Sequence, residues 1–122
     1  MEIILDTNFI VTALREKIPF LDDLRDMMPY AEIVVPEQVI VELEKAGDSS
    51  KLKIKDREAA VLGLQLVKDI RKISLEKRYV DKGILEYAKN NPEVYVATLD
   101  RELKEQLDRV ITIRGNKKII IS

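Results

Sequence analysis

The stretch EIILDTNFIV (residues 2–11) joins a short apolar run to three polar residues, after which apolar residues return with a different period. The run EIIL (2–5) is short and β-branched, as in strands that are buried on both faces of a sheet. The apolar residues behind it have the spacing of one helix face: Phe9, Ile10, Ala13 and Leu14. The stretch predicts a buried strand that ends at Asp6 and leads into a helix. It leaves open whether Asp6 only caps that helix or also binds something.

The alternation of strand and helix continues along the chain. Apolar and β-branched runs predict further strands at 32–35, 94–99, 110–113 and 118–121, the last two joined by a turn in RGNK (114–117). Apolar residues at helical spacing, bounded by prolines and a glycine, predict helices at 19–28, 36–46, 56–72, 79–90 and 100–107. This order predicts an α/β fold with a central, mostly parallel sheet that is covered on both faces.

Two of these helices carry more specific expectations. Gly47 is expected to end the helix that begins at Pro36, with a flexible loop in GDSSKLKIK (47–55) behind it. The helix at 56–72 is expected to bury one apolar stripe, whose members repeat every three or four residues: Ala59, Leu62, Leu66, Ile70 and Ile73.

Length and composition set the class of protein. The 122 residues fit a single domain over 1–122, which can bury roughly two-thirds of its unfolded surface. Apolar residues make up 46% and charged residues 35%, which is typical of a globular protein. No apolar run approaches the ~20 residues of a membrane span, and no basic leader pattern opens the chain, so we expect a cytoplasmic protein.

The chain has no histidine and no cysteine. This excludes disulfides, thiolate nucleophiles and zinc–thiolate sites, and it removes the commonest general base. Polar chemistry must come from carboxylates, Lys, Arg, Tyr or hydroxyls, and carboxylates without nitrogen or sulfur ligands suit Mg²⁺ or Mn²⁺. Because the net charge is only −1, any nucleic-acid binding would have to be local.

Two aspartates stand at the ends of predicted parallel strands. Asp6 follows the first strand and Asp100 follows VYVATL (94–99), and each precedes a helix that it could cap. Ligands of open α/β sheets bind at the edge where the parallel strands end, so we expect both carboxylates at that edge. Asn8 and Thr98 each lie two residues away and could supply supporting hydrogen bonds, or could simply be helix-start and strand residues.

Two further acids lie on predicted helices. Glu42 is about 60° from the apolar stripe of its helix, which makes it a boundary residue or a glutamate paired with a lysine. Asp81 begins the helix at 79–90, where it shares the inward stripe of Ile84 and Ala88 or caps the helix. Four acids at one edge would repel one another and raise one another's pKa, a penalty that a divalent cation removes. The sequence therefore predicts a carboxylate metal site.

These residues resemble the PIN domain, a family of metal-dependent ribonucleases, over nearly the whole chain. The pieces that match are IILDTNFIV (3–11), VPEQVIVELEK (35–45), YVDKGILEYA (79–88) and VATLDRELKEQL (96–107). The resemblance implies a Rossmann-like three-layer αβα fold and hydrolysis of RNA phosphodiester bonds with Mg²⁺ or Mn²⁺. It also implies a catalytic, metal-binding quartet, namely Asp6, Glu42, Asp81 and Asp100, with Asn8 and Thr98 beside it.

The match has departures that bear on the biological role. Leu99 stands where the family often has Asn, which alters local hydrogen bonding but removes no ligand. The loop 47–55 and the end RGNKKIII (114–121) look more like stand-alone archaeal or processome-type PIN proteins than VapC-like toxins. The partners that this resemblance leaves open are RNA, a second copy of the chain, an antitoxin and a ribosome-assembly factor, and no membrane partner is expected.

Basic residues around the predicted acidic site could hold an RNA backbone. The candidates are Lys51, Lys53, Lys55 and Arg57 in one segment, Arg101 after the last acid, and Arg114, Lys117 and Lys118 near the end. Each could equally be a solvated surface charge. Aromatic residues are only 5% of the chain, so we expect base stacking to contribute little.

Two alternative functions remain open. Aspartyl-phosphate enzymes also begin with a strand that ends in Asp, but their D-x-D-x-T pattern would need an acid at Asn8 and a threonine at Ile10. A non-catalytic PIN subunit that binds RNA or protein in ribosome assembly is the stronger alternative. Loss of acidic ligands would favour it, and all four acids are present.

Overall fold

The computed structural model describes residues 1–115 and 117–122. The elements in chain order are β1 (Glu2–Leu5), α1 (Thr7–Arg15), α2 (Phe20–Met27), β2 (Glu32–Pro36), α3 (Glu37–Asp48), α4 (Ile54–Leu66), β3 (Arg71–Ile73), α5 (Val80–Asn90), β4 (Tyr95–Ala97), α6 (Arg101–Glu105), β5 (Val110–Arg114) and β6 (Lys118–Ile121). Over these described ranges the strands form one sheet in the order β3-β2-β1-β4-β5-β6, and only β5 and β6 pair antiparallel. The predicted α/β fold with a mostly parallel sheet is confirmed.

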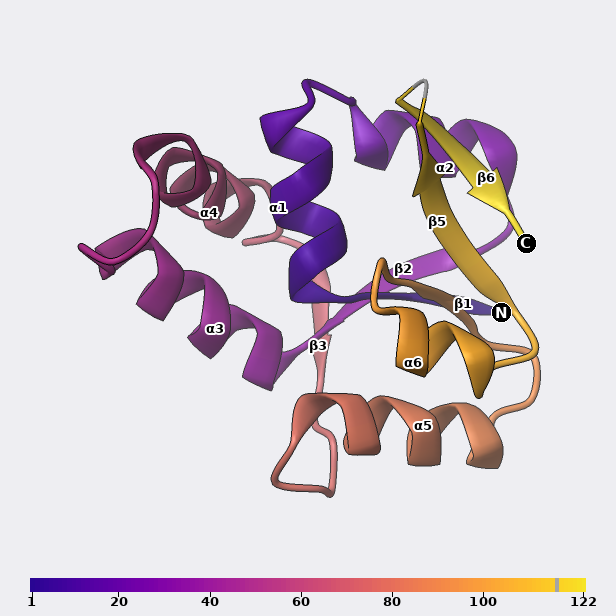
Figure 1. Ribbon diagram of the computed structural model, residues 1–122. Helices are drawn as coiled ribbons and strands as arrows, with labels where there is room; N and C mark the ends of the chain where they lie inside the picture. The colour runs from indigo at the N-terminus through magenta and orange to yellow at the C-terminus, as the bar shows by residue number, and fades with distance from the viewer. Residues whose placement is uncertain (116) are drawn as a thin grey trace.

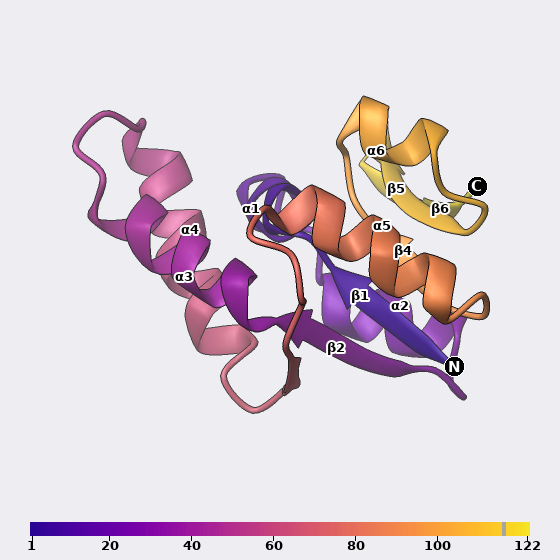
Figure 2. The same cartoon turned by 90° about the horizontal axis from the view of Figure 1, so that it is seen from below.

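Helices cover both faces of the sheet (Figures 1 and 2). Ile3 and Leu5 of β1 belong to one buried core, to which α1, α2, α3 and α4 contribute side chains. Ile4 belongs to a second core with side chains of α5 and α6. Since successive strand residues point to opposite faces, a strand between two cores must be apolar at every position. This explains the unbroken apolar run that opens the chain.

The order of strands places a crevice beside β1. The chain moves from β1 to β2 on one side of it and later returns to β4 on the other side, so the direction of strand addition reverses there. Such a reversal separates the connecting helices and leaves room for a ligand outside the carboxyl ends of the two strands. The residues that follow β1 and β4 therefore face one another across this crevice.

The single helix predicted over 56–72 is wrong. The structure ends α4 at Leu66 and forms β3 a few residues later, paired with β2. The ammonium of Lys72 donates to the carbonyl oxygens of Val67 at 2.8 Å and Ile70 at 2.6 Å. These bonds satisfy carbonyls around the helix end that would otherwise lack partners. The strand exists because the edge of β2 is available to it, which no local pattern reveals.

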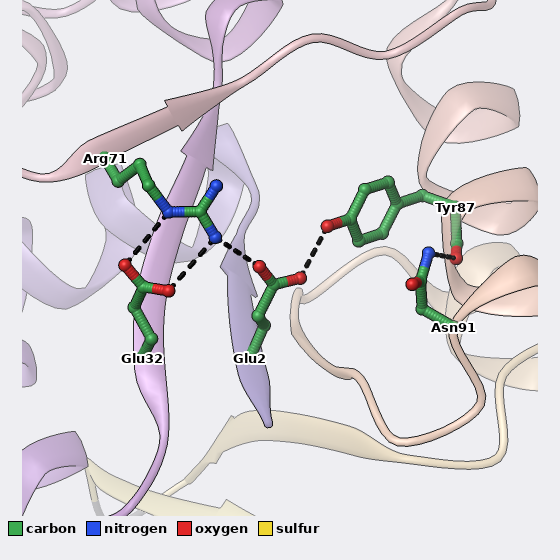
Figure 3. Close-up of polar contacts among 5 residues, drawn as sticks. All are labelled: Glu2, Glu32, Arg71, Tyr87 and Asn91. Atoms are coloured by element: carbon green, nitrogen blue, oxygen red, sulfur yellow. Dashed lines mark hydrogen bonds and ion pairs between the residues drawn. The ribbon is translucent and has the colours of Figure 1, made fainter.

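The Arg71 side chain links β3 to the amino ends of β2 and β1 (Figure 3). Its guanidinium donates to Glu32 at 2.9 and 3.0 Å and also to Glu2. The hydroxyl of Tyr87 on α5 donates to Glu2 at 2.5 Å. Burial raises the pKa of Tyr87 to about 12, and the hydrogen bond to Glu2 and the negative charge of Glu2 contribute to this increase. The network ties β1, β2, β3 and α5 together at the end of the sheet opposite the crevice.

The apolar stripe predicted for the helix at 56–72 is wrong at Leu62 and Leu66 but correct at Ala59 and Ile73, which are buried. Leu62 and Leu66 are 44% and 41% exposed, whereas Ala59 and Gly63 are buried. A Cβ added to Gly63 would lie 2.7 Å from Ile10 Cγ2, so α4 approaches α1 through its small residues. The large apolar side chains Leu62 and Leu66 therefore lie on the exposed face of α4.

Gly47 does not end α3. The helix continues to Asp48 with Ser49 as its C-cap, and no glycine in the described residues has a positive φ. A Cβ at Gly47 would lie 3.0 Å from Val61 Cγ2, so the glycine permits close packing of α3 and α4. The loop predicted over 47–55 is correspondingly short. The predicted turn at 114–117 includes Asn116, which lies outside the described residues.

Across the described ranges, every helix is too short or too polar to cross a bilayer.

Candidate functional site

A cleft of about 580 Å³ opens at the carboxyl ends of β1 and β4. The two strands are neighbours, and the backbone N–H of Asp6 donates to the carbonyl oxygen of Ala97 at 3.0 Å. Side chains from α1, α3, α4 and α5 and from the start of α6 line the cleft. All four acids of the predicted quartet are among them, namely Asp6, Glu42, Asp81 and Asp100.

Asp6 is the most buried of these acids, at 9% exposure. Its Oδ1 accepts from the Thr7 backbone N–H at 2.9 Å, which makes it the N-cap of α1, and its Oδ2 accepts from the Thr98 hydroxyl at 2.7 Å. Desolvation by burial raises the pKa of Asp6, the charges of Glu42 and Asp100 add to this, and the two hydrogen bonds oppose it. The capping role is confirmed, and it leaves the carboxylate facing the cleft.

Thr98 connects the two strand ends. It is fully buried, and its hydroxyl both donates to Asp6 and accepts from the backbone N–H of Asp100 at 3.1 Å. The amide oxygen of Asn8 accepts from the Leu99 backbone N–H at 3.0 Å. β4 (Tyr95–Ala97) is shorter than the strand predicted over 94–99, although the Thr98 backbone N–H still donates to the Ile111 carbonyl oxygen of β5 at 3.0 Å. Asn8 and Thr98 thus hold the β4–α6 connection against the start of α1.

Asp100 caps α6 by accepting from the Leu103 backbone N–H at 3.1 Å. Glu42 comes from α3 and is exposed, but its carboxylate accepts a hydrogen bond from the Thr7 hydroxyl. Thr7 was not among the predicted site residues, although its position directly behind Asp6 could have indicated it.

Asp81 does not share the inward stripe of its helix, contrary to expectation. It is exposed in the first turn of α5, whereas Ile84 is fully buried. Three residues rotate a helix by about 300°, so Asp81 sits about 60° away from Ile84, enough at a helix end to reach solvent. Tyr79, not Asp81, occupies the N-cap position. The side chain of Asp81 nevertheless lines the cleft.

The four acids share the cleft without forming a closed ligand set. Within residues 1–115 and 117–122, no three acidic side chains are close enough together to hold a metal ion. The charges of Glu42 and Asp100 contribute to the raised pKa of Asp6. Asp81 stands apart at the rim formed by α5.

The basic residues predicted to contact RNA lie outside this lining, as far as the described residues go. Lys117 pairs with Glu16 at 3.3 Å, and Arg101 lies 4.0 Å from Glu105. The remaining candidates are Lys51, Lys53, Lys55, Arg57, Arg114 and Lys118. A role in RNA binding for any of them stays a prediction.

Three charged or aromatic residues of the cleft lining were not among the predicted site residues, namely Arg15, Asp56 and Tyr79. Arg15 ends α1 and pairs with Asp56 of α4 at 2.9 Å, and both line the cleft. Tyr79 precedes α5 and places an exposed ring at the rim. Tyr79 belongs to the matching piece YVDKGILEYA (79–88), but no motif indicates that it shares a cleft with Arg15 and Asp56, because this depends on how α1, α4 and α5 pack.

Comparison with known proteins identifies the family to which this chain belongs. A family profile described as "PIN like domain" matches residues 3–116. The chain belongs to the PIN-like domain family. Ribonuclease VapC4 of Methanocaldococcus jannaschii is 38% identical over 107 residues, which are 87% of this chain and 82% of that protein.

Solved structures of PIN-like proteins agree with this assignment. The PIN domain endonuclease Utp24 has a TM-score of 0.76 and 25% identity, over 99% of this chain and 90% of that one. The VapBC2 structure from Rickettsia felis, bound to a promoter DNA fragment, has a TM-score of 0.59 at 14% identity, over 93% and 100%, and shares the fold. The expected PIN resemblance is confirmed. Its relatives include both a protein named VapC and an endonuclease of the Utp24 kind, so the choice between toxin and processing factor stays a prediction.

Proposed function

We propose that this protein is a divalent-metal-dependent ribonuclease that hydrolyses phosphodiester bonds of single-stranded RNA in the cleft, acting as one domain over 1–122. The observation that carries the proposal is the gathering of Asp6, Glu42, Asp81 and Asp100, from separate parts of the chain, around one cleft at the strand ends. The similarity to Ribonuclease VapC4 and to the endonuclease Utp24 supports it.

The donor atoms of the cleft suit a divalent cation in their chemistry, and binding would have to draw the carboxylates closer together than they lie here. The described lining of the cleft holds five carboxylates and one guanidinium, and burial and neighbouring carboxylates raise the pKa of Asp6. Hard oxygen donors of this kind suit Mg²⁺ or Mn²⁺. Asp6, Glu42, Asp81 and Asp100 would hold the ion. When bound, it would lower the pKa of a coordinated water and stabilise the charge that develops on the phosphate.

The chain's own residues prepare this centre. Thr98 and the Thr7 backbone hold both oxygens of Asp6, and the Thr7 hydroxyl orients Glu42. Asn8 fixes the connection that carries Asp100. Positioning of this kind matters because catalytic groups act only in a narrow range of geometry.

Hydrolysis at this centre needs no histidine. A carboxylate accepts the proton of the attacking water as the water oxygen bonds to phosphorus. The bond to the 3′-oxygen then breaks and that oxygen takes up a proton, which leaves a 5′-phosphate and a 3′-hydroxyl.

The biological setting is part of the proposal. The name VapC4 favours a toxin-type endoribonuclease with an antitoxin partner, whereas the likeness to Utp24 favours processing of RNA in ribosome biogenesis. Either role would be carried out in the cytoplasm, and a homodimer is compatible with both. A gene for a small DNA-binding protein beside the gene for this chain would favour the toxin.

The test is cleavage of a 5′-labelled single-stranded RNA with Mn²⁺. Wild type is expected to cut, and Asp6→Asn and Asp100→Asn are expected to lose the activity, as is wild type in EDTA. Asp108→Asn, which changes an exposed acid outside the cleft lining, is the matched control and should cut like wild type.

Two outcomes would contradict the proposal. If pure wild type never cuts RNA while the aspartate variants bind it as tightly as wild type does, the chain is a binding subunit. If wild type and the variants cut equally, the activity belongs to a contaminating nuclease.

A further inference from the structure

The cleft extends beyond the acidic quartet along α1. Asp6 and Arg15 stand at opposite ends of this helix, nine residues apart, which corresponds to about 13 Å of helical rise. Both line the same cleft, so the cleft continues from the strand ends to the last turn of α1. α4 runs beside α1 at this point (Figure 1). The far end therefore has room for part of a substrate that is not undergoing reaction.

Arg15 is held in place from the opposite wall. Its Nη1 lies 2.9 Å from Oδ1 of Asp56 in the first turn of α4, with the two side chains 40% and 23% exposed. The pair uses one N–H of a guanidinium that has five, and the structure records no second hydrogen bond to this side chain among the described residues. Asp56 thus orients the guanidinium, whose other N–H groups have no recorded acceptor among the described residues.

A half-exposed ion pair of this kind contributes little to stability, because water screens it. Its position is more informative than its strength. Arg15 is the single basic residue in the described lining of the cleft, where it stands opposite several carboxylates. The carboxylates repel an anionic RNA strand that enters the cleft. This repulsion is offset in two places, namely where a bound cation neutralises the carboxylates and at Arg15. The planar fork of arginine matches the oxygens of a phosphate.

We propose that Arg15, oriented by Asp56, binds a backbone phosphate of single-stranded RNA next to the phosphodiester that is cleaved. This proposal rests on the proposed ribonuclease function and assigns a second contact for the same substrate strand. It makes Arg15 the residue that fixes the register of the strand in the cleft, while the acids act on the neighbouring phosphate.

Binding of a 5′-fluorescein-labelled RNA dodecamer, followed by anisotropy at several NaCl concentrations, tests the proposal. Measurements use the Asp100→Asn background with Mn²⁺, so that the RNA is not cut. Arg15→Gln is expected to raise Kd about tenfold, as loss of a charged hydrogen bond does. It should also reduce the slope of log Kd against log salt by about 0.7, the value of one phosphate contact on a single strand.

The partner variant separates phosphate binding from a structural role. Asp56→Asn keeps an oxygen that can accept from Arg15 but removes a negative charge from the cleft, so it should tighten RNA binding about two- to threefold. Arg15→Lys keeps the charge and should recover most of the salt slope. Arg25→Gln, which removes an exposed charge on α2 outside the lining, is the control and should bind like the parent.

Opposite effects of Arg15→Gln and Asp56→Asn on Kd support the proposal. Equal weakening by both variants, or an unchanged salt slope in Arg15→Gln, overturns it. Those results leave the ribonuclease function standing if wild type cuts RNA. A wild-type protein that neither binds nor cuts RNA overturns both proposals.

Discussion

Removing the Thr98 hydroxyl should destabilise the protein far more than removing an equally buried hydroxyl elsewhere. Thr98 is fully buried, and its hydroxyl bonds to the Asp6 carboxylate at 2.7 Å and to the Asp100 backbone N–H at 3.1 Å, with the Asn8 amide oxygen as a longer third partner at 3.4 Å. Thr98→Val keeps the shape of the side chain but removes the partner of Asp6 Oδ2 and of the Asp100 backbone N–H, while Asp6 Oδ1 keeps its bond to the Thr7 backbone. A hydrogen bond to a charged group contributes about 1.5–3 kcal/mol and a neutral one about 1 kcal/mol.

The expected loss in the free energy of unfolding is about 2–3 kcal/mol, after allowing for the gain from burying a methyl group in place of a hydroxyl. For a chain of this length, 1 kcal/mol corresponds to about 4 °C in Tm. Thr98→Val should therefore melt about 8–12 °C below wild type in calorimetry or circular dichroism at pH 7 without metal.

Thr112 supplies the matched control. It lies in β5 at 5% exposure, and its hydroxyl is buried without a hydrogen-bond partner among the described residues. Thr112→Val removes a buried polar atom that makes no bond, so it should be neutral or stabilise by about 1 kcal/mol. If the two variants lose the same stability, or if Thr98→Val melts like wild type, the hydrogen bonds at the strand ends do not stabilise the site as argued here.

Two further predictions concern Asp6 and the contact between α1 and α4. Burial raises the pKa of Asp6 from its ordinary value of 3.8, so this group favours the folded state at low pH and loses that contribution as pH rises through the raised pKa. Without metal, Asp6→Asn should therefore have a higher Tm than wild type at pH 7, and this difference in Tm should shrink towards pH 3.8. A difference in Tm that is constant with pH would contradict this reasoning. Gly63→Ala should cost about 1–2 kcal/mol in urea unfolding, because overpacking against Ile10 exceeds the gain in helix propensity, whereas Gly115→Ala, with no atom within 4 Å of its added Cβ, should change little.

The edge of the sheet at which β1 and β4 end could be predicted from local sequence patterns. The apolar run before Asp6 and the one before Thr98 identified parallel strands, and parallel strands end on one edge of a sheet whatever the details of packing. Asp6 and Asp100 could therefore be placed at a common edge in advance. The absence of His and Cys narrowed the chemistry to carboxylates, because composition does not depend on the fold.

Helix faces and helix ends were less predictable. Leu62 and Leu66 have the period of a buried face, yet α4 buries its small residues Ala60 and Gly63 because α1 and α3 approach it closely. The residues at 71–73 formed a strand where a helix was expected, because the edge of β2 and the carboxylates of Glu2 and Glu32 were available to Arg71. The local periodicity shows where large apolar side chains recur along a helix. Whether that face is buried depends on which elements of the rest of the chain pack against it.

Apart from β3, the succession of strands and helices along the chain and the class of fold follow from short-range patterns, since each depends on neighbouring residues alone. The shape of the cleft does not. Thr98 reaches Asp6 from 92 positions away, Thr7 reaches Glu42 across 35, and Arg15 reaches Asp56 across 41. Such contacts arise from the packing of whole elements. The exposure of Asp81, the isolation of Arg15 among carboxylates and the distances within the quartet could therefore be known only once the chain had folded.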